Sequence, residues 1–367
     1  EDIAMQMDSI GASIASQSGN NTLGLSMTLA RGERDLEFAA ELLGDILANA
    51  TYPEDQFAKQ LEVLSMMAVR QNANWVVEVQ NFMRRELFGG NPYANSPYST
   101  PEVVAKLTRD DVLEFAAAKV RPEGMVIAVA GDVDVAKTIE LLKAALEGWT
   151  PEGEYVLTAP AAPAWEGGGL PEPRFAFREN EKAQASLCIA FPGTRYTNLE
   201  DRAALTLVDA FTSGIGMPSG WLHTALRGGD RSYVYYVHLT NFTGLEPGCL
   251  YITTQTETRY LKEVYDLLMA EIDRLRRGEF TEEELELGRA MALVAQPYSS
   301  QTVNAVATGL ALSELYGVGY DGDEKFEALV KKVTREDVMR VVKKHFGHMV
   351  VAVAGPAGAR EAFESLK

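Results

Sequence analysis

The second half of the chain contains a few segments with the apolar period of a β-strand and a larger number with the apolar period of a helix. Strands are predicted over residues 185–191, 233–240, 249–256 and 349–354. Helices are predicted over residues 199–212, 214–226, 260–277, 281–296, 301–315, 324–332 and 335–345. The strands are few and are not interleaved one-for-one with helices. This order favours an α+β fold with a mainly antiparallel sheet over a doubly wound parallel sheet.

Part of this pattern occurs twice along the chain. Residues 107–133 read LTRDDVLEFAAAKVRPEGMVIAVAGDV, and residues 333–357 read VTREDVMRVVKKHFGHMVVAVAGPA. Each copy predicts a Thr N-cap with an acid three residues later, an amphipathic helix, and a strand (MVIAVAG or MVVAVAG) that ends at a glycine. A second pair of segments, 35–57 and 260–285, matches at nearly the same offset. Two matches in the same order predict two homologous domains.

We place the first domain at residues 1–150 and the second at residues 174–367, each a sandwich of helices on a mainly antiparallel sheet. Residues 151–173 are rich in Pro, Gly and Ala and lack either period, so they are predicted to form a linker with a flexible joint at its glycine run. The repeat offset matches residues 13–17 and 23–29, two further predicted strands, to the strands at 233–256. The strand and helix that precede this pair in the second copy have no counterpart in the first. We therefore expect the first domain to lack its N-terminal strand and helix, a stretch of roughly 50–70 residues.

The chain carries 34 Lys and Arg residues against 52 Asp and Glu residues, a formal net charge of −18 at pH 7. A polyanion of this size repels phosphate groups, which argues against a protein that binds nucleic acid or anionic membranes. A hydrophobic content of 46% is typical of a folded protein, and no apolar run is long enough to span a membrane. Cys188 and Cys249 lie in apolar, β-rich stretches and are predicted to be buried free thiols. Met66, Met67 and Trp75 fall on helical faces and are predicted to be core residues.

The chain has four histidines, and none of them lies in the first 222 residues. His345 and His348 are three residues apart at a helix-to-strand break, but no third ligand lies near them in sequence, so we predict no metal site there. The acidic run at 282–284 follows Thr281. This pattern predicts a capping box between Thr281 and Glu284 at a helix N-terminus rather than a carboxylate site.

Several strings along the chain occur in the order and spacing of one known family. They include MDSIGASIAS, LGLSMTLARGERDLEFAAELLGDIL, YPEDQFAKQLEVL, ELFGGNPYANSPYSTPEVV and GMPSGWLHTALRGGDRSYVYYV. Through them the whole chain resembles the pitrilysin/insulinase-type metallopeptidases, the inverzincins, which include the mitochondrial processing peptidase and the respiratory-chain core proteins. The resemblance implies a pair of homologous α+β domains that form half of a clamshell enclosing a peptide.

The resemblance also implies where zinc would be bound, and this chain departs from that pattern. In active members the first domain of the catalytic half carries H-x-x-E-H on a helix, and a glutamate on a later helix completes the site. This chain has no histidine before His223, and the positions on its later helix that match the family's acids fall near Gln60 and Met67. An amide and a thioether cannot replace a carboxylate on a water-activating zinc. We therefore predict neither a metal site nor a catalytic residue on this chain and expect zinc in a partner half.

In the non-zinc half of this family, an arginine and a tyrosine about seven residues apart reach the substrate beside the metal. The match here is Arg227 and Tyr233, which are six apart, with Tyr235 and Tyr236 as alternatives if the register is shifted. An Arg fork and a phenol can both donate hydrogen bonds to a peptide carbonyl and to a developing oxyanion. The alternative is structural: Arg227 caps its helix near Gly228, and Tyr233 is a strand aromatic that faces the core.

These observations favour the non-catalytic half of a zinc metallopeptidase, which binds peptide substrate and helps form the closed proteolytic chamber. Its expected partners are a zinc-bearing homologous half, in the same precursor or in a separate subunit, and a peptide. A homodimer is also compatible with the sequence. We expect the chain to be inactive as a peptidase when it is alone. The alternatives are a structural or assembly subunit related to the respiratory-chain core proteins, without peptide chemistry, and a stand-alone peptide-binding module.

Overall fold

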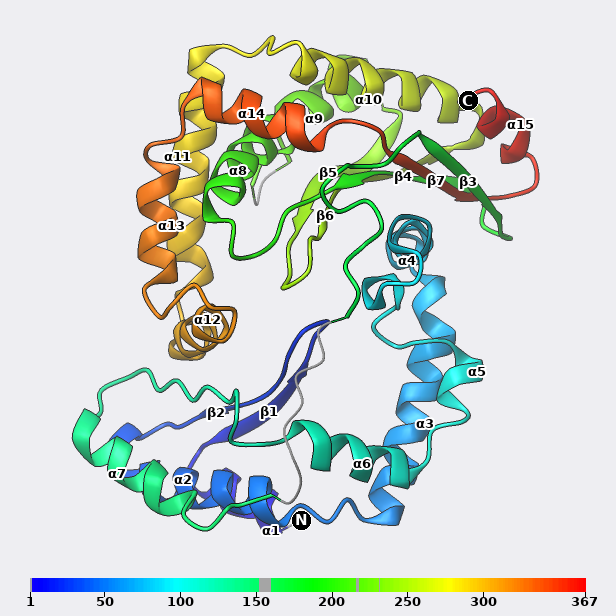
Figure 1. The fold of residues 1–367 in the computed structure, drawn as a ribbon. Coiled ribbons are helices and arrows are strands. Elements are labelled where there is room, and N and C mark those ends of the chain that lie inside the picture. Colours follow the sequence, from blue (N-terminus) through cyan, green and yellow to red (C-terminus); the bar gives the residue numbers. More distant parts are fainter. Residues whose placement is uncertain (1, 152–159, 216–217, 231) are drawn as a thin grey trace. The chain divides into compact units, whose positions relative to one another are not determined.

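The computed structural model describes residues 2–151, 160–215, 218–230 and 232–367 (Figure 1). The chain forms two compact units. Unit 1 comprises residues 1–69, 98–159 and 299–322, and unit 2 comprises residues 70–97, 160–298 and 323–367. These units interleave in sequence, whereas the predicted domains are consecutive. A sequence repeat indicates common ancestry, whereas the compact units are defined by which segments contact one another. The division into homologous domains at 1–150 and 174–367 therefore stays a prediction.

Unit 2 is built around a five-stranded sheet in the order β3-β7-β4-β6-β5. Its strands are β3 (Arg174–Glu179), β4 (Gln184–Pro192), β5 (Val234–Phe242), β6 (Cys249–Glu257) and β7 (Val350–Gly355). β3 and β7 run parallel, and the other neighbouring pairs run antiparallel. The central strands β4 and β7 are continuous apolar runs because both faces of the sheet are covered there. The predicted α+β class with a mainly antiparallel sheet is confirmed.

Helices cover one face of this sheet and enclose the larger apolar core (Figure 1). The helices that contribute buried side chains are α8 (Leu199–Ser213), α9 (Gly220–Arg227), α10 (Leu261–Arg276), α11 (Glu282–Ser299), α13 (Gly322–Val330), α14 (Arg335–His345) and α15 (Ala359–Glu364). The short 3-10 helix η3 (Thr258–Tyr260) leads into α10. α9 contacts α8, α10 and the edge strand β5, and these contacts fix the helix end that carries Arg227.

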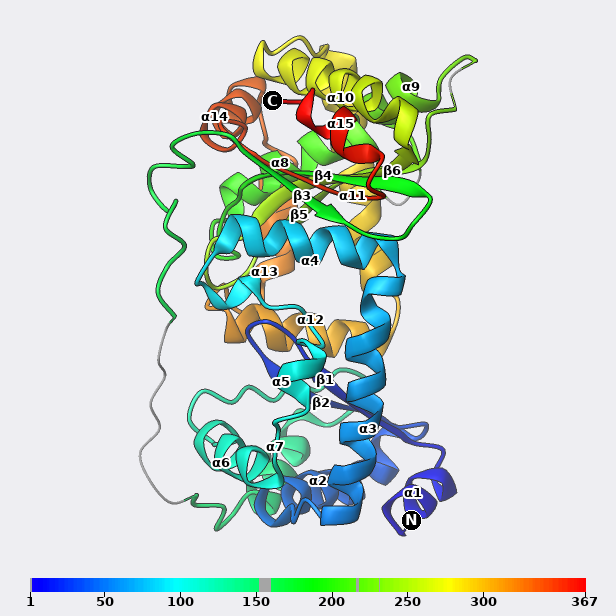
Figure 2. The same cartoon turned by 90° about the vertical axis from the view of Figure 1, so that its right-hand side faces the viewer.

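The opposite face of the sheet is covered by α4 (Trp75–Phe88), which comes from an earlier part of the chain (Figure 2). The short helices η1 (Gln71–Ala73) and η2 (Pro92–Ala94) flank it. Val79, Met83 and Leu87 of α4 form a second core with small residues of β4 and β7. Glu78 is buried beside them and accepts hydrogen bonds from Lys182 at 2.5 Å and from Asn180 at 2.9 Å.

The described end of the predicted linker, residues 160–173, is packed rather than loose. Trp165 and Leu170 are buried in the core under α4, and the Trp165 indole donates to the Leu87 carbonyl at 3.1 Å. The flexible joint expected at the glycine run is instead an ordered turn, in which Gly169 donates its backbone N–H to the Trp165 carbonyl at 2.8 Å. Burial of one large aromatic side chain anchors this segment. Residues 152–159 of the predicted linker lie outside the described residues.

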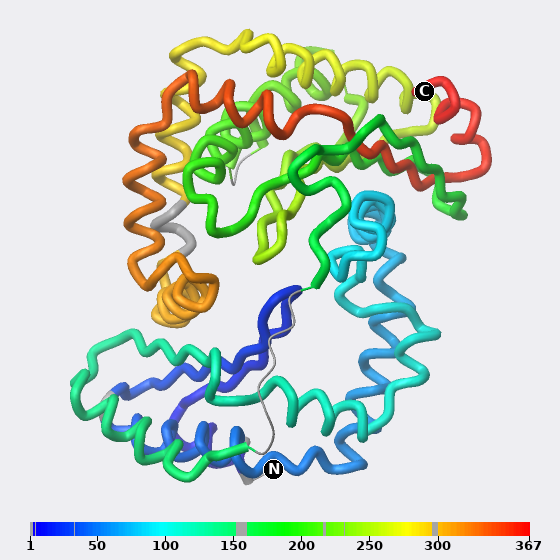
Figure 3. The backbone as a smooth tube through the Cα atoms, viewed as in Figure 1, coloured from blue at the N-terminus to red at the C-terminus, as the bar shows by residue number. Residues whose placement is uncertain are grey.

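Unit 1 holds the antiparallel pair β1 (Ser13–Ser18) and β2 (Leu23–Thr28), at the positions where the repeat predicts two strands. Its helices are α1 (Asp2–Ser9), α2 (Gly32–Asn49), α3 (Glu54–Arg70), α5 (Pro101–Val104), α6 (Arg109–Lys119), α7 (Val135–Ala145) and α12 (Val303–Leu315). α2 and α7 lie side by side (Figure 3). Gly44 permits this contact, because a Cβ there would lie 2.2 Å from the Ala145 carbonyl oxygen.

Two predictions for unit 1 are wrong. Residues 125–130 lack the strand that their likeness to β7 predicts. β7 is paired on both sides, by β3 and β4, whereas residues 125–130 are not paired with either of the strands β1 and β2 described in unit 1. Backbone groups without such a partner strand do not form a strand. Met66 and Met67 are 45% and 44% exposed on α3 instead of lying in a core. Trp75 does pack against the core under α4.

Candidate functional site

The candidate site lies where the end of α9 meets the start of β5. α9 begins at Gly220, which has a φ of +83°, and a Cβ at this position would lie 2.7 Å from the Phe211 carbonyl oxygen of α8. Only glycine therefore lets the start of α9 approach α8 this closely. The helix ends at Arg227, and the Gly228 N–H donates to the Thr224 carbonyl at 3.0 Å. Arg227 therefore lies in the last turn of α9 with its side chain exposed, and the start of this helix is held close to α8.

A β-bulge shapes the strand that follows. Val234 pairs with Thr256 and Val237 pairs with Thr254, so Tyr235 and Tyr236 together oppose one residue of β6. Both valines are buried in the core, whereas Tyr235 is 89% exposed and Tyr236 is 40% exposed. The bulge therefore presents two tyrosines in succession at the edge of the sheet.

The structure brings Arg227 to Tyr235. The Arg227 guanidinium carbon lies 5.7 Å from the centroid of the Tyr235 ring, within the range of a cation–π contact. Tyr236 packs edge-on against Trp75 of α4, with ring centroids 6.1 Å apart. These contacts place a cation and two phenols on one exposed region of unit 2.

The contacts of Tyr233 lead to another part of unit 2. Its hydroxyl donates to Glu263 at 2.6 Å, and its ring lies 5.1 Å from the ring of Tyr260, beside the start of α10. Tyr233 also comes before β5 begins at Val234. The tyrosine that contacts Arg227 is therefore Tyr235, which the sequence analysis names as an alternative to Tyr233. The sequence signal was the run VYYV, in which the buried valines are three residues apart instead of two.

Three ionisable side chains lie beside this pair. Burial lowers the pKa of His223, the nearby charges of Arg227 and His238 lower it further, and a hydrogen bond to the Val237 backbone partly offsets them. Burial also lowers the pKa of His238, whose Nδ1 lies 3.1 Å from the Ser213 Oγ. Burial raises the pKa of Asp209 to about 7, although Ser213 donates a hydrogen bond to it at 2.6 Å. Burial therefore favours the neutral form of all three groups.

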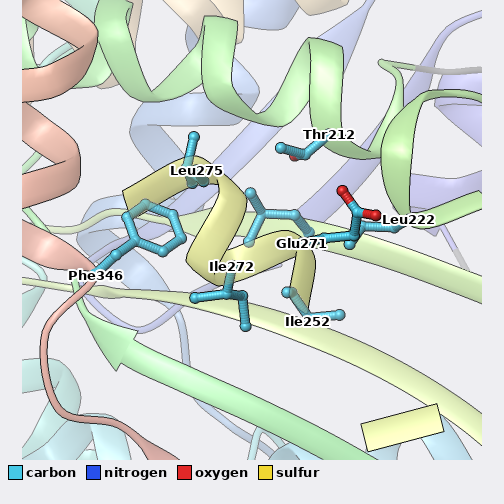
Figure 4. A pocket seen from close by; sticks show the side chains of 8 residues that line it. Thr212, Leu222, Ile252, Glu271, Ile272, Leu275 and Phe346 are labelled. Carbon is cyan, nitrogen blue, oxygen red and sulfur yellow. The ribbon is translucent and has the colours of Figure 1, made fainter. Parts of the chain in front are cut away.

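A small cavity lies in the core of unit 2 and not at this site. It has a volume of about 10 Å³ and is lined by Thr212, Leu222, Leu239, Ile252, Glu271, Ile272, Leu275 and Phe346 (Figure 4). That volume holds about one water molecule. A cavity of this size is too small for a peptide.

The side chains that match the family's metal positions do not suit zinc. Gln60 and Met67 are both exposed on α3, with an amide and a thioether where a carboxylate would be needed. His345 is buried and is bonded to Asp201 and to the Pro192 carbonyl, whereas His348 is exposed. Within the described ranges, no three His, Cys, Asp or Glu side chains are grouped so that they could hold a metal ion.

Two further sequence predictions are confirmed. Thr281 and Glu284 form the capping box of α11, with hydrogen bonds of 2.8 Å and 3.1 Å. Cys188 and Cys249 are free and buried, and burial raises the pKa of the Cys188 thiol to about 12. A thiol with such a pKa is not a nucleophile at neutral pH.

In the part of the chain that the structure describes, no helix has the length and apolar character needed to cross a membrane.

Comparison with known proteins settles the family. Residues 106–291, just over half of the chain, match the family model described as the peptidase M16 inactive domain. The chain belongs to this family. The resemblance to pitrilysin-type peptidases and to their non-zinc half is thereby confirmed, and the chain is a non-catalytic M16 segment.

The M16 assignment agrees with similar proteins and with a solved structure. An uncharacterized zinc protease of Rickettsia bellii is 23% identical over 96% of this chain and 82% of its own length. Subunit 1 of the human mitochondrial cytochrome b-c1 complex is 32% identical over 34% of this chain, and the match spans only 26% of that subunit. The crystal structure of the peptidase M16 inactive domain from Pseudomonas fluorescens superposes with a TM-score of 0.80 at 21% identity, over 97% of this chain and 83% of that one. This likeness shows the M16 fold.

Proposed function

We propose that this chain is the non-catalytic half of a zinc metallopeptidase, which binds peptide substrate and helps to form the closed proteolytic chamber. The observation that carries the proposal is the exposed pair of Arg227 and Tyr235 at the end of α9 and the start of β5. This pair has the residue types that the family uses for substrate, on a chain of the M16 inactive-domain family.

The chemistry of the pair suits an extended peptide. Arg227 offers a fork of N–H donors and Tyr235 offers a hydroxyl, and both can donate to one peptide carbonyl. β5 is the terminal strand in the sheet order, and an extended peptide can add to such an edge as a further strand. Side-chain donors would hold the carbonyl while the strand edge sets the direction of the peptide.

The zinc would belong to a homologous half. The Rickettsia bellii relative is named a zinc protease, whereas the residues of α3 in this chain do not suit zinc. We infer that a zinc-bearing M16 half, in the same precursor or in another subunit, completes the chamber. The purified chain alone should then cleave no peptide. Zinc-dependent cleavage by this chain that a chelator abolishes would contradict the proposal.

The test is peptide binding by single-site variants. The probe is a short, unfolded, fluorescein-labelled peptide rich in Lys and Arg, chosen because the net charge of the chain is −18. Fluorescence anisotropy should show that Arg227→Ala weakens binding about tenfold, because it removes charge-assisted hydrogen bonds. Tyr235→Phe should weaken binding, and Tyr233→Phe should not.

A matched control is available in the same unit. Arg259 is exposed and lies over the Tyr260 ring at 4.6 Å, so Arg259→Ala removes an equivalent cation–π contact away from the site. This variant should bind the peptide as the wild type does. If the Arg227 and Tyr235 variants also bind like the wild type, the proposed site is wrong.

The second candidate is a structural or assembly subunit, which is favoured by the match to the human cytochrome b-c1 subunit. Such a subunit would join a homologous half without touching peptide. Assaying the assembled M16 pair separates the two roles: unchanged peptidase activity in the Arg227→Ala and Tyr235→Phe variants supports the scaffold, and a large loss with the pair intact supports substrate binding.

A further inference from the structure

The hairpin of unit 1 repeats the edge hairpin of unit 2 in its strand register. Ile14 of β1 pairs with Met27 of β2, and Leu239 of β5 pairs with Ile252 of β6. Both residues of the second pair lie 225 positions after their counterparts in the first. Because one offset relates both strands, the two hairpins are equivalent. Unit 2 therefore shows which elements can lie beside such a hairpin.

The next elements beside the hairpin of unit 2 are β4 and α8. Ile189 of β4 pairs with Ile252 of β6 on one side and with Val351 of β7 on the other. α8 follows β4 in sequence, contacts β5 and α14, and shares the larger core with them. One strand–helix segment thereby buries a face of the hairpin, of β7 and of α14.

Unit 1 contains the neighbours of such a segment, but its described elements include no counterpart of the segment itself. In the described part of unit 1, β2 is paired with β1 alone. Residues 125–130, which match β7 in sequence, form no strand. They lead to Asp132, whose carbonyl oxygen would lie 3.2 Å from a Cβ on Gly32, shortly after β2. The two segments that would flank an added strand are thus both present.

Apolar side chains at the matching positions are exposed in unit 1 and buried in unit 2. Those of the hairpin and of residues 125–130 are between 37% and 41% exposed, and their counterparts are at most 1% exposed: Ile14, Leu25, Ile127 and Val129 against Leu239, Leu250, Val351 and Val353. α12 contacts β2 but leaves these side chains exposed. Phe115 of α6 is 53% exposed, whereas Val341, its counterpart on α14, lies in the core that α8 shares. Exposed apolar surface of this extent is typical of an interaction site.

We propose that unit 1 binds a strand–helix segment of the kind that β4 and α8 form, residues 184–213. The strand adds to β2 and pairs with residues 125–130 on its other side, and the helix covers Leu25 and Phe115. β4 and α8 of this chain are themselves buried in unit 2, so a second copy has no free segment of this kind. The occupant is therefore a segment with the same apolar pattern that is not part of residues 1–367. This surface belongs to unit 1 and does not depend on Arg227 and Tyr235.

The test titrates a strand–helix peptide into the whole chain. The probe is a fluorescein-labelled synthetic peptide with the sequence of residues 184–213, because the residues that face this segment in unit 2 have apolar counterparts in unit 1. Its fluorescence anisotropy should rise to saturation, and a scrambled peptide of the same composition should not bind.

Hydrogen exchange locates the bound peptide. Amides of residues 23–28 and 125–130 should exchange at least tenfold more slowly in the complex, because both segments gain a partner strand. Amides of β6 and β7 should be unchanged. Absence of binding, or protection of β6 and β7 alone, would overturn the proposal.

Single substitutions test the surface itself. Leu25→Asp and Phe115→Asp should each weaken binding at least tenfold, since each places a carboxylate in an apolar contact. Both side chains are exposed in the free chain and lie on separate elements, so both variants should keep the thermal midpoint of the wild type. Wild-type affinity in these two variants would show that the peptide binds elsewhere, and the proposal would be wrong.

Met66→Asp is the matched control. The matched segments that end at 57 and 285 align Met66 of α3 with Val294 of α11, and both side chains are exposed. The added segment is therefore not expected to cover this position, and Met66→Asp should bind the peptide as the wild type does.

A second copy of the chain is the competing occupant. Sedimentation velocity without peptide should give the same result for the wild type, Leu25→Asp and Phe115→Asp. A concentration-dependent dimer that both substitutions abolish would show that this surface joins two copies, and it would overturn the proposal.

Discussion

At the scale of single residues, the tyrosine that contacts Arg227 is Tyr235, two positions after the Tyr233 that the sequence motif indicates. Tyr233 precedes β5 and gives its hydroxyl to Glu263, so its polar end is already used inside unit 2. Tyr235 sits in the bulge and is 89% exposed, with its ring under the guanidinium. A donor that recognises a peptide must be unsatisfied by the protein itself and open to solvent before the peptide binds. Of the two tyrosines, Tyr235 has the accessibility that this role requires.

The two histidines beside the site should titrate at lower pH than a free imidazole. Burial disfavours the charged ring of both, and the neighbouring Arg227 adds to the effect at His223, so both pKa values should lie below 6.5. In ¹⁵N NMR spectra of a histidine-labelled chain, the four rings can be assigned with four single substitutions. A midpoint for His238 above 6.5 would mean that the Asp209 carboxylate outweighs burial.

The buried carboxylate of Asp201 should stabilise the folded chain through ion pairs with the half-exposed side chains of Arg340 and Lys344. It is 1% exposed and accepts hydrogen bonds from Lys344 at 2.6 Å, from His345 at 3.3 Å and from Arg340. Burial alone would raise its pKa, but these three donors outweigh burial and hold the pKa well below 3.8. Asp201→Asn removes the carboxylate that accepts from the half-exposed Arg340 and Lys344 and from the buried His345, so it should cost about 1–3 kcal/mol of unfolding free energy near neutral pH.

The pH dependence of this cost follows from the lowered pKa. A carboxylate whose pKa is depressed by folding stabilises the protein above its unfolded pKa, and this contribution is lost as the pH falls through the folded value. Urea unfolding of the wild type and Asp201→Asn should therefore show a difference that is constant above about pH 5 and narrows in stronger acid. The control is Glu200→Gln, an exposed neighbour that should change stability little. A difference that widens in acid would contradict the assignment.

At the scale of elements, segments that carry their own signals were predictable from sequence. β4, β6, α10 and α14 fall within a few residues of their predicted ranges, because apolar period and capping residues are local. Residues 125–130 show where prediction from local sequence fails, because they form no strand. They are as apolar as β7, yet a strand requires neighbours, and pairing is a property of the whole sheet. For the same reason the packing of α4 on the sheet of unit 2 had no signal in its own sequence.

The residue types of the candidate site were predictable from the sequence, but the position of its tyrosine was not. Arg227 and a nearby tyrosine were named from the motif, whereas the choice among three tyrosines depended on the bulge at residues 235–236. A bulge adds one residue to one strand, so the family's spacing between arginine and tyrosine did not separate Tyr233 from Tyr235, although the three-residue separation of the valines in VYYV indicates the bulge. The surrounding Asp209, Ser213 and His238 come from segments that only the fold brings together.

The capping boxes of the two repeat copies provide a matched pair of helices. Thr108 and Asp111 cap α6, and Thr334 and Asp337 cap α14, each with both reciprocal hydrogen bonds. α14 buries Val338, Val341 and Val342, whereas no residue of α6 is buried, and all of α6 is described. The same cap therefore stabilises one helix that is part of a core and one that is not.

Removing each cap should have unequal consequences. Thr334→Ala should lower the global unfolding free energy by about 1 kcal/mol, the usual value of a Thr N-cap, because α14 unfolds with its core. Thr108→Ala should leave the global value unchanged and speed amide exchange only within residues 109–119. Equal losses of global stability in the two variants would show that α6 is coupled to a core after all.

At the scale of the whole molecule, buried apolar surface is distributed unevenly between the two units. The two clusters of buried apolar side chains found in the described residues both belong to unit 2. In unit 1, every residue of β1 is exposed, α6 buries none of its residues, and α7 buries only Thr138. Apolar burial is the main favourable term in folding, so the free energy that resists local opening should differ between the units.

Native-state hydrogen exchange at increasing guanidinium concentration tests this difference. Amides of α6 and α7 should exchange through openings of low free energy that depend little on denaturant, since such openings expose little surface. Amides of β4, β6 and β7 should exchange only when unit 2 unfolds, with a steep dependence on denaturant. α14 is the internal control, because it repeats the sequence pattern of α6 but is buried in the core of unit 2. If α6 is as protected as α14 and responds as steeply, the distribution of burial does not set the local stability of this chain.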